Sequence, residues 1–242
     1  MYENTRYLFA GDKALVLEYG NEIDEKINHR VRFMMTAIEK SNLEGITELV
    51  PTFRSLLVHY NPLIISYEEL VQALKKIEKN CKAIKLDEPL VIEIPTLYAG
   101  EYGPDIENVA SHNNLTVKDV IDIHSAGLYL IYMLGFTPGY PYLGGMDPRI
   151  ATPRLKVPRT KIDAGAVGIA QMQTGIYPIE SPGGFQIIGR TPVKLYDSSR
   201  SEPILMKCGN YVKFVPIDEK EFNRIKSAEE KGEYRCQEYP VK

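Results

Sequence analysis

Backbone amides are the first groups in this sequence that could do chemistry. Within QTGIYPIESPGGFQIIGRTP (173–192), Gly183 and Gly184 follow Ser181 and Pro182. Glycines leave their N–H groups unobstructed, and a turn with consecutive N–H groups can bind an oxyanion. We therefore expect Gly183 and Gly184 to act in catalysis. Tight β-turns in a small barrel are the alternative, and the residues alone leave both interpretations open.

Polar side chains surround this glycine pair in a region that is otherwise poor in charge. We expect five of them to bind substrate: Arg159, Gln173, Tyr177, Glu180 and Arg190. Arg159 belongs to ATPRLKVPRTK (151–161), where prolines keep the chain extended and Arg154, Lys156 and Lys161 also project. A guanidinium binds a carboxylate or phosphate bidentately, so Arg159 or Arg190 would hold such a group. The alternative for 151–161 is a solvated loop.

His124 closes the apolar helical stretch TVKDVIDIHSAG (116–127) and could assist proton transfer. The alternative is a partly buried histidine at a helix end, where the macrodipole favours the cationic form. The other histidines lack the HxH, HxxxH or HExxH spacing of a metal site. Cys81, Cys208 and Cys236 are far apart, which fits a reducing cytosol and argues against zinc. We expect no metal.

An uncharged and rigid stretch, GFTPGYPYLGG (135–145), precedes these segments. Phe136, Tyr140 and Tyr142 would supply apolar area at little entropic cost. We expect them to form the wall of a pocket or an interface.

Several functions are disfavoured by what the sequence lacks. A net charge of −3 gives no basic face for nucleic acid. No apolar run approaches the ~18 residues of a membrane span, and the start does not resemble a signal peptide, so we expect a cytoplasmic protein. VGIAQMQTG (167–175) has no lysine and is no phosphate loop, and Ser181 is not in a GxSxG elbow. We expect no nucleotide site in this chain.

The first 95 residues alternate strands and helices. ALVLEY (14–19), ITELV (46–50), SLLVHY (55–60) and LVIEIP (90–95) read as strands. Residues 21–40 carry one apolar helical stripe, and Ser66 with Glu69 caps a second helix. The order is βαββαβ, which predicts a ferredoxin-like domain over 1–95.

The second half changes character. Two helices are expected, one after 97–105 and one from Thr116, followed by a strand at 129–134. Residues 135–192 hold 10 of the 18 glycines and 8 of the 16 prolines, with short β-runs between turns. This predicts a closed or nearly closed β structure over 96–217. The charged tail 218–242 would carry at most a short helix around Phe222 and Ile225, so the fold class is α+β.

The dense segments together resemble the KipI or allophanate hydrolase subunit 1 family. The resemblance runs through 135–192 and extends upstream to YAGEYGPDIENVA (98–110) and DVIDIHSAG (119–127). It implies that the ferredoxin-like domain is followed by a cyclophilin-like β-barrel. One departure is Gln171, where many relatives have glycine, and it leaves the identity of the substrate open.

The family includes components of prokaryotic 5-oxoprolinase. The resemblance implies ATP-dependent opening of 5-oxoproline to glutamate, together with two partner proteins, the C subunit of homologous fold and the A subunit. ATP would be bound on one of these partners, and the chain alone would be inactive. In this reaction Gly183 and Gly184 would stabilise the oxyanion, Arg159 or Arg190 would hold the substrate carboxylate and His124 would move a proton. The alternatives are an inhibitor of a sporulation-type histidine kinase and, last, a urea or allophanate carboxyl-transfer component.

Overall fold

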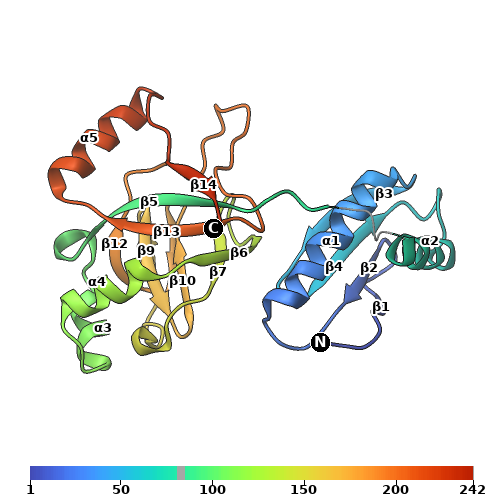
Figure 1. The fold of residues 1–242 in the computed structure, drawn as a ribbon, viewed down its shortest axis with the longest axis horizontal. Coiled ribbons are helices and arrows are strands. Elements are labelled where there is room, and N and C mark those ends of the chain that lie inside the picture. Colours follow the sequence, from blue (N-terminus) through green and yellow to red (C-terminus); the bar gives the residue numbers. More distant parts are fainter. Residues whose placement is uncertain (81–84, 242) are drawn as a thin grey trace. The chain divides into compact units, whose positions relative to one another are not determined.

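The computed structural model describes residues 1–80 and 85–241, so Cys81 lies outside the described residues. The chain divides into two compact units, Met1–Glu88 and Pro89–Lys242 (Figure 1). Each unit has its own apolar core.

The first unit is a four-stranded antiparallel sheet with two helices. Its elements are β1 (Arg6–Phe9), β2 (Ala14–Glu18), α1 (Glu25–Ser41), β3 (Ile46–Pro51), β4 (Ser55–Tyr60) and α2 (Tyr67–Asn80). The strand order is β1-β2-β4-β3. Alternate residues of β2 and β4, such as Leu15 and Val58, face Ile27 and Val31 of α1 and Leu70 of α2. This alternation on one face is what a half-buried sheet under amphipathic helices requires.

The predicted βαββαβ order of this unit is wrong at both ends. The fourth strand of its sheet is β1, which the prediction missed. Residues 90–95 lie in β5 (Leu90–Tyr98), which pairs in parallel with β13 (Tyr211–Pro216) of the second unit. The predicted boundary at residue 95 therefore falls inside a strand, and the division lies between residues 88 and 89.

The second unit is built on an eight-stranded sheet. Its helices are η2 (Gly100–Tyr102), α3 (Ile106–His112), α4 (Val117–Ala126), η3 (Pro148–Ile150) and α5 (Glu219–Glu230). Its remaining strands are β6 (Tyr129–Leu134), β7 (Pro141–Gly144), β8 (Arg159–Ile162), β9 (Ala166–Ala170), β10 (Gln173–Ile176), β11 (Ser181–Gly183), β12 (Gln186–Arg190) and β14 (Glu238–Pro240). The order is β10-β9-β12-β5-β13-β6-β7, with β14 on β5. The end strands β7 and β10 approach each other, so the sheet is nearly closed, as the sequence predicted.

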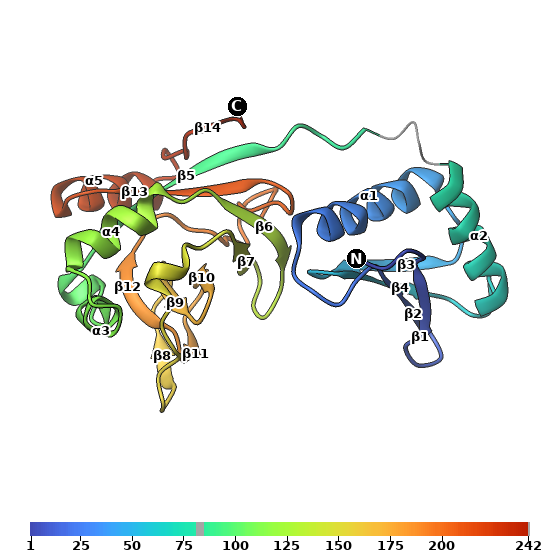
Figure 2. The ribbon, with the colours of Figure 1, turned by 60° about the horizontal axis from the view of Figure 1, so that its bottom comes forward.

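Strands β8 and β11 form a separate two-stranded ribbon. Figure 2 shows this ribbon projecting from the body of the second unit. Residues 151–158 lead into it, and the Leu155 N–H donates to the Gly184 carbonyl at 2.8 Å. Two of the segments singled out in the sequence therefore lie side by side.

Helix α4 begins as predicted. The Thr116 hydroxyl accepts from the Asp119 N–H while the Asp119 carboxylate accepts from the Thr116 N–H, a complete capping box. The helix ends at Ala126, so His124 occupies its last turn.

The tail after residue 217 belongs to the second unit. The predicted short helix is confirmed as α5, with Phe222 and Ile225 buried. Beyond it, β14 pairs with β5, so the tail is an integral part of this sheet and not a separate segment.

Candidate functional site

Two segments of the sequence, 135–145 and 173–192, converge on one group of aromatic rings, here called the aromatic cluster. Its members are Phe136, Tyr140, Tyr142, Tyr177 and Phe185. Tyr140 is the centre, with ring centroids at 5.5 Å from Phe136, 5.3 Å from Tyr142 and 5.5 Å from Tyr177, all edge-to-face. Phe185 contacts Tyr177 at 5.9 Å and Tyr140 at 6.5 Å. Edge-to-face geometry is the favoured arrangement of aromatic pairs.

Glycines make room for these rings. A Cβ on Gly175 would lie 2.4 Å from the Tyr140 hydroxyl, and one on Gly183 would lie 2.2 Å from the Tyr177 hydroxyl. Real Cβ atoms do not approach heavy atoms so closely. Gly175 and Gly183 are therefore needed for ring packing, which explains part of the glycine density of 173–192.

Arg154 brings a positive charge to this cluster. Its guanidinium lies over the Phe185 ring, 5.4 Å from the centroid, in a cation–π contact. Arg154 is exposed and makes no ion pair or hydrogen bond with any described residue. Burial raises the pKa of Tyr140 well above its usual value, and the positive charge of Arg154 has a smaller, opposite effect on that pKa.

The loop that carries Tyr140 is strained at its exposed end. Phe136 is 61% exposed and has a φ of 62°. A bulky residue in this left-handed region is an outlier, and such strain concentrates at functional sites. Phe136, Tyr140 and Tyr142, expected to form the wall of a pocket or an interface, therefore lie together in the cluster, with Tyr140 buried and Phe136 at its rim.

His124 does not lie at this surface. Its exposed fraction is 0%, and its ring packs on Phe214 with centroids 4.4 Å apart. The prediction that His124 assists proton transfer to substrate disagrees with this burial, because no substrate atom can reach the ring. The helix-end alternative also fails in one respect. Burial lowers the pKa of His124 to about 3, so the ring is neutral and not a cation.

His124 instead links four elements through a chain of hydrogen bonds. Its Nδ1 lies 2.8 Å from the Tyr98 hydroxyl and its Nε2 lies 2.8 Å from the Thr174 hydroxyl. The Thr174 hydroxyl donates its only proton to the Gly168 carbonyl at 3.1 Å, so it must accept from Nε2–H. Nδ1 then accepts from Tyr98. The chain fixes one neutral tautomer and ties α4 to β5, β9 and β10.

Arg159 is already engaged. Its two terminal nitrogens each lie 2.8 Å from an Asp105 oxygen, a bidentate pair. The same carboxylate also accepts from the Ile187 N–H at 2.7 Å. The Asp105 carboxylate neutralises the charge of Arg159, and the hydrogen bonding between them raises the pKa of the Arg159 guanidinium. This pair joins the ribbon to the start of α3. Because both terminal nitrogens of Arg159 are bound to Asp105, the expected role of Arg159 in binding a substrate carboxylate is not favoured.

Arg190 is similarly occupied. It donates to the Ala164 carbonyl at 3.0 Å and to an Asp163 oxygen at 3.1 Å. Arg190 and Arg159 do line one shallow pocket of about 290 Å³ with Tyr102. These arginines are two of the five predicted substrate-binding residues.

The other predicted binding residues are dispersed. Glu180 is exposed and pairs with Lys161 at 2.7 Å on the outside of the ribbon. Gln173 begins β10, next to the buried Thr174. Tyr177 lies in the aromatic cluster with 2% of its surface exposed. They do not form one polar site.

The predicted amide nest at Gly183 and Gly184 is also not formed. Gly183 is a residue of β11 and pairs with Arg159 of β8. Neither glycine has a positive φ, whereas a nest alternates right- and left-handed residues. The backbone at this glycine pair therefore lacks the conformation that gathers successive N–H groups around an oxyanion.

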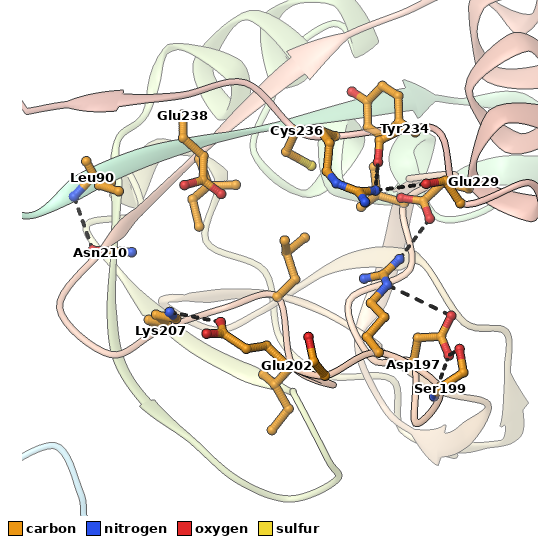
Figure 3. Close-up of a pocket in the computed structure, with 18 residues that line it drawn as sticks. Leu90, Asp197, Ser199, Glu202, Lys207, Asn210, Glu229, Tyr234, Cys236 and Glu238 are labelled. Carbon is orange, nitrogen blue, oxygen red and sulfur yellow. Dashed lines mark hydrogen bonds and ion pairs between the residues drawn. The ribbon is translucent and has the colours of Figure 1, made fainter.

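A larger pocket of about 640 Å³ lies beneath the C-terminal segment (Figure 3). The loop 197–210 forms one wall, and residues 229–238 form the other. Arg200 pairs there with the buried Glu229 at 2.9 Å, and Lys207 pairs with Glu202 at 3.0 Å. None of the predicted site residues lines this pocket.

The sequence interpretation missed two participants in the aromatic cluster. Arg154 stood among the projecting cations of 151–161, but no pattern separated it from Arg159. Phe185 directly follows the glycine pair, and that proximity was the only signal for it. Among the described residues, no group of His, Cys, Asp and Glu could hold a metal, and no helix is long and apolar enough to cross a membrane.

Comparison with known proteins defines the class first. The family model for the carboxyltransferase domain, subdomain C and D, matches residues 5–206. The chain belongs to this family, which confirms the family resemblance seen in the sequence.

Within that class, the particular relatives are informative. The chain is 43% identical over 227 residues to the B subunit of 5-oxoprolinase from Bacillus subtilis (strain 168), covering 89% of this chain and 94% of the relative. A conserved uncharacterized protein of Pyrococcus horikoshii is 53% identical, with a TM-score of 0.53, and the match covers 90% of this chain and 100% of that one. The urea amidolyase of K. lactis, at 24% identity, shares only the fold, with a TM-score of 0.79 over 98% of this chain and 16% of that one.

Proposed function

We propose that this chain is the B subunit of a 5-oxoprolinase, a hydrolase complex that opens 5-oxoproline to glutamate with consumption of ATP. The observation that carries the proposal is the 43% identity to a protein of that name over nearly the full length of both chains. A match of this extent includes both compact units and both segments of the aromatic cluster. It is far more specific than the shared fold, which hosts many functions.

The chemistry that such a complex must perform is demanding, because a lactam is a stable amide. Phosphorylation of the lactam oxygen by ATP would turn that oxygen into part of a leaving group. Water would then add to the ring carbon and the C–N bond would break, with the nitrogen leaving as the amine, to give an acyl phosphate. A second water would hydrolyse that acyl phosphate to glutamate and free phosphate. Binding energy must be concentrated on the charged groups that change during these steps.

The roles within the complex follow from what this chain carries. Its sequence has no phosphate-binding loop, which supports binding of ATP on a partner protein. We propose the A and C subunits of the complex as these partners and expect no turnover by this chain alone. Phe136, Val157 and Met172 are exposed apolar residues of the second unit, and exposed apolar side chains are suited to contact with a protein partner.

A genetic experiment tests the proposal in the cell. Deletion of the gene for this chain should raise the intracellular pool of 5-oxoproline, measured by mass spectrometry, and the wild-type gene should restore it. The matched control is deletion of a neighbouring gene outside the complex. An unchanged pool after deletion would contradict the proposal, as would restoration by an empty vector.

A further inference from the structure

Two hydroxyl groups in the loop 135–145 have no hydrogen-bond partner among the described residues. The Thr137 Oγ1 is buried and unpaired. Tyr140 is only 4% exposed, and its hydroxyl likewise bonds to no described group. Buried polar groups are nearly always satisfied in native proteins, so each exception needs an explanation. Thr137 Oγ1 is such an exception, and the Tyr140 hydroxyl close to it in the sequence is a donor without a partner in the described part of the chain, available to a ligand.

An unpaired cation lies on the neighbouring ring of the aromatic cluster. The Arg154 guanidinium lies over Phe185, whose ring contacts Tyr140, and Arg154 has no acidic partner in the described part of the chain. Arg159 and Arg190 by contrast pair with Asp105 and Asp163. Of these three arginines near the ribbon, Arg154 alone keeps its charge available for a ligand.

Backbone strain is the third observation at this place. Phe136 holds a positive φ while its ring packs edge-to-face on Tyr140. The strained residue thus braces the ring that carries the unpaired hydroxyl. Strain of this kind persists only where the surrounding structure enforces it, and it commonly serves a ligand site.

We propose that the Tyr140 hydroxyl and the Arg154 guanidinium together bind the carboxylate of the substrate. One neutral O–H donor and one guanidinium match a singly charged carboxylate, whereas a phosphate dianion calls for more positive charge. The aromatic rings would pack against the apolar part of a small cyclic acid. The inference rests on the proposed function and names the part of this chain that recognises the substrate.

The carboxylate could also come from an acidic side chain of a partner protein in the complex. The two sources predict different defects. Loss of substrate recognition raises KM while the complex still assembles. Loss of an interface contact weakens assembly and leaves KM of the assembled complex unchanged.

Three variants test the site in the full complex reconstituted with its two partner proteins. Arg154→Gln and Tyr140→Phe should each raise KM for 5-oxoproline about 10- to 100-fold, the range expected on loss of a hydrogen bond to a charged group. Arg154→Lys should recover part of the loss, because it restores the charge without the planar fork. Arg149→Gln is the control, since Arg149 is exposed in the same unit and pairs locally with Asp147. Elution in gel filtration reports assembly.

The stability of Tyr140→Phe separates recognition from structure. Because the hydroxyl has no partner among the described residues, its removal should leave the melting temperature unchanged or raise it. An unchanged KM for both Tyr140→Phe and Arg154→Gln in an active complex would overturn the carboxylate site alone, as would impaired assembly with normal KM. If the wild-type complex makes no glutamate, the proposed function fails and the site falls with it.

Discussion

Replacing His124 by glutamine should change how the stability of the second unit depends on pH. In the folded protein burial lowers the pKa of His124 to about 3, against an ordinary value of 6.5. Below pH 6.5 the unfolded chain takes up a proton that the folded chain does not bind. Stability is therefore lost as the pH falls from about 6.5 toward about 3. The glutamine variant has no such group.

The size of the effect follows from those two values. Between pH 7.5 and pH 5.0, His124 should cost the wild-type protein about 2 kcal/mol of unfolding free energy, on the order of magnitude given by proton linkage. His29 also has a pKa lowered by burial, and Glu229 has one raised by burial. Both are present in wild type and variant, so they cancel in the difference between the two proteins.

The assay is urea unfolding at both pH values, followed by near-ultraviolet circular dichroism of the tyrosines. The variant will be less stable at pH 7.5, because the Tyr98 hydroxyl loses its acceptor, but its stability should fall about 2 kcal/mol less on acidification. Nitrogen NMR of the wild-type ring should show a proton on Nε2 throughout this range. Equal pH dependence in the two proteins would refute the account of His124, as would a ring that titrates near pH 6.5.

Two further pairs of variants test the packing described above by thermal unfolding. Gly183→Ala should destabilise the protein by about 1–3 kcal/mol, because the added Cβ would collide with the Tyr177 hydroxyl. Gly184→Ala should change stability by less than about 0.5 kcal/mol, because the nearest atom to its added Cβ is 3.8 Å away. Equal effects would contradict the assigned packing. Asp105→Asn should cost about 2 kcal/mol by releasing Arg159, while Glu180→Gln in an exposed pair should cost less than about 0.5 kcal/mol. A larger loss from Glu180→Gln would show that the Lys161–Glu180 pair is not a simple solvated ion pair.

The local elements were largely predictable from the sequence. Helices α1 and α2, the capping box of α4 and the strand at 129–134 all follow from apolar periodicity and caps, which act over a few residues. The assignment of residues 90–95 to the first domain failed because pairing was decided by β13, more than a hundred residues later. Strand β1 was missed because only four residues form it and most of them are exposed.

The aromatic cluster was predictable as a region but not residue by residue. The dense segments of 135–192 contain its rings, yet burial and ion pairing favour other roles for individual residues than those expected. His124 ends a helix in the sequence, but only the packing of Phe214 and Tyr98 around it makes it a neutral core residue. Arg159 and Arg154 are equivalent as residue types. What separates them is Asp105, which lies outside the segment and engages only one of the two.

Glutamate formation in a purified system tests the central claim most directly. The two partner proteins of the complex would be combined with ATP and 5-oxoproline, with and without this chain, and glutamate would be measured enzymatically. The account predicts turnover only when all three proteins are present, rising with added chain until it saturates at a fixed ratio to the others. Glutamate formation at the same rate without this chain would contradict it.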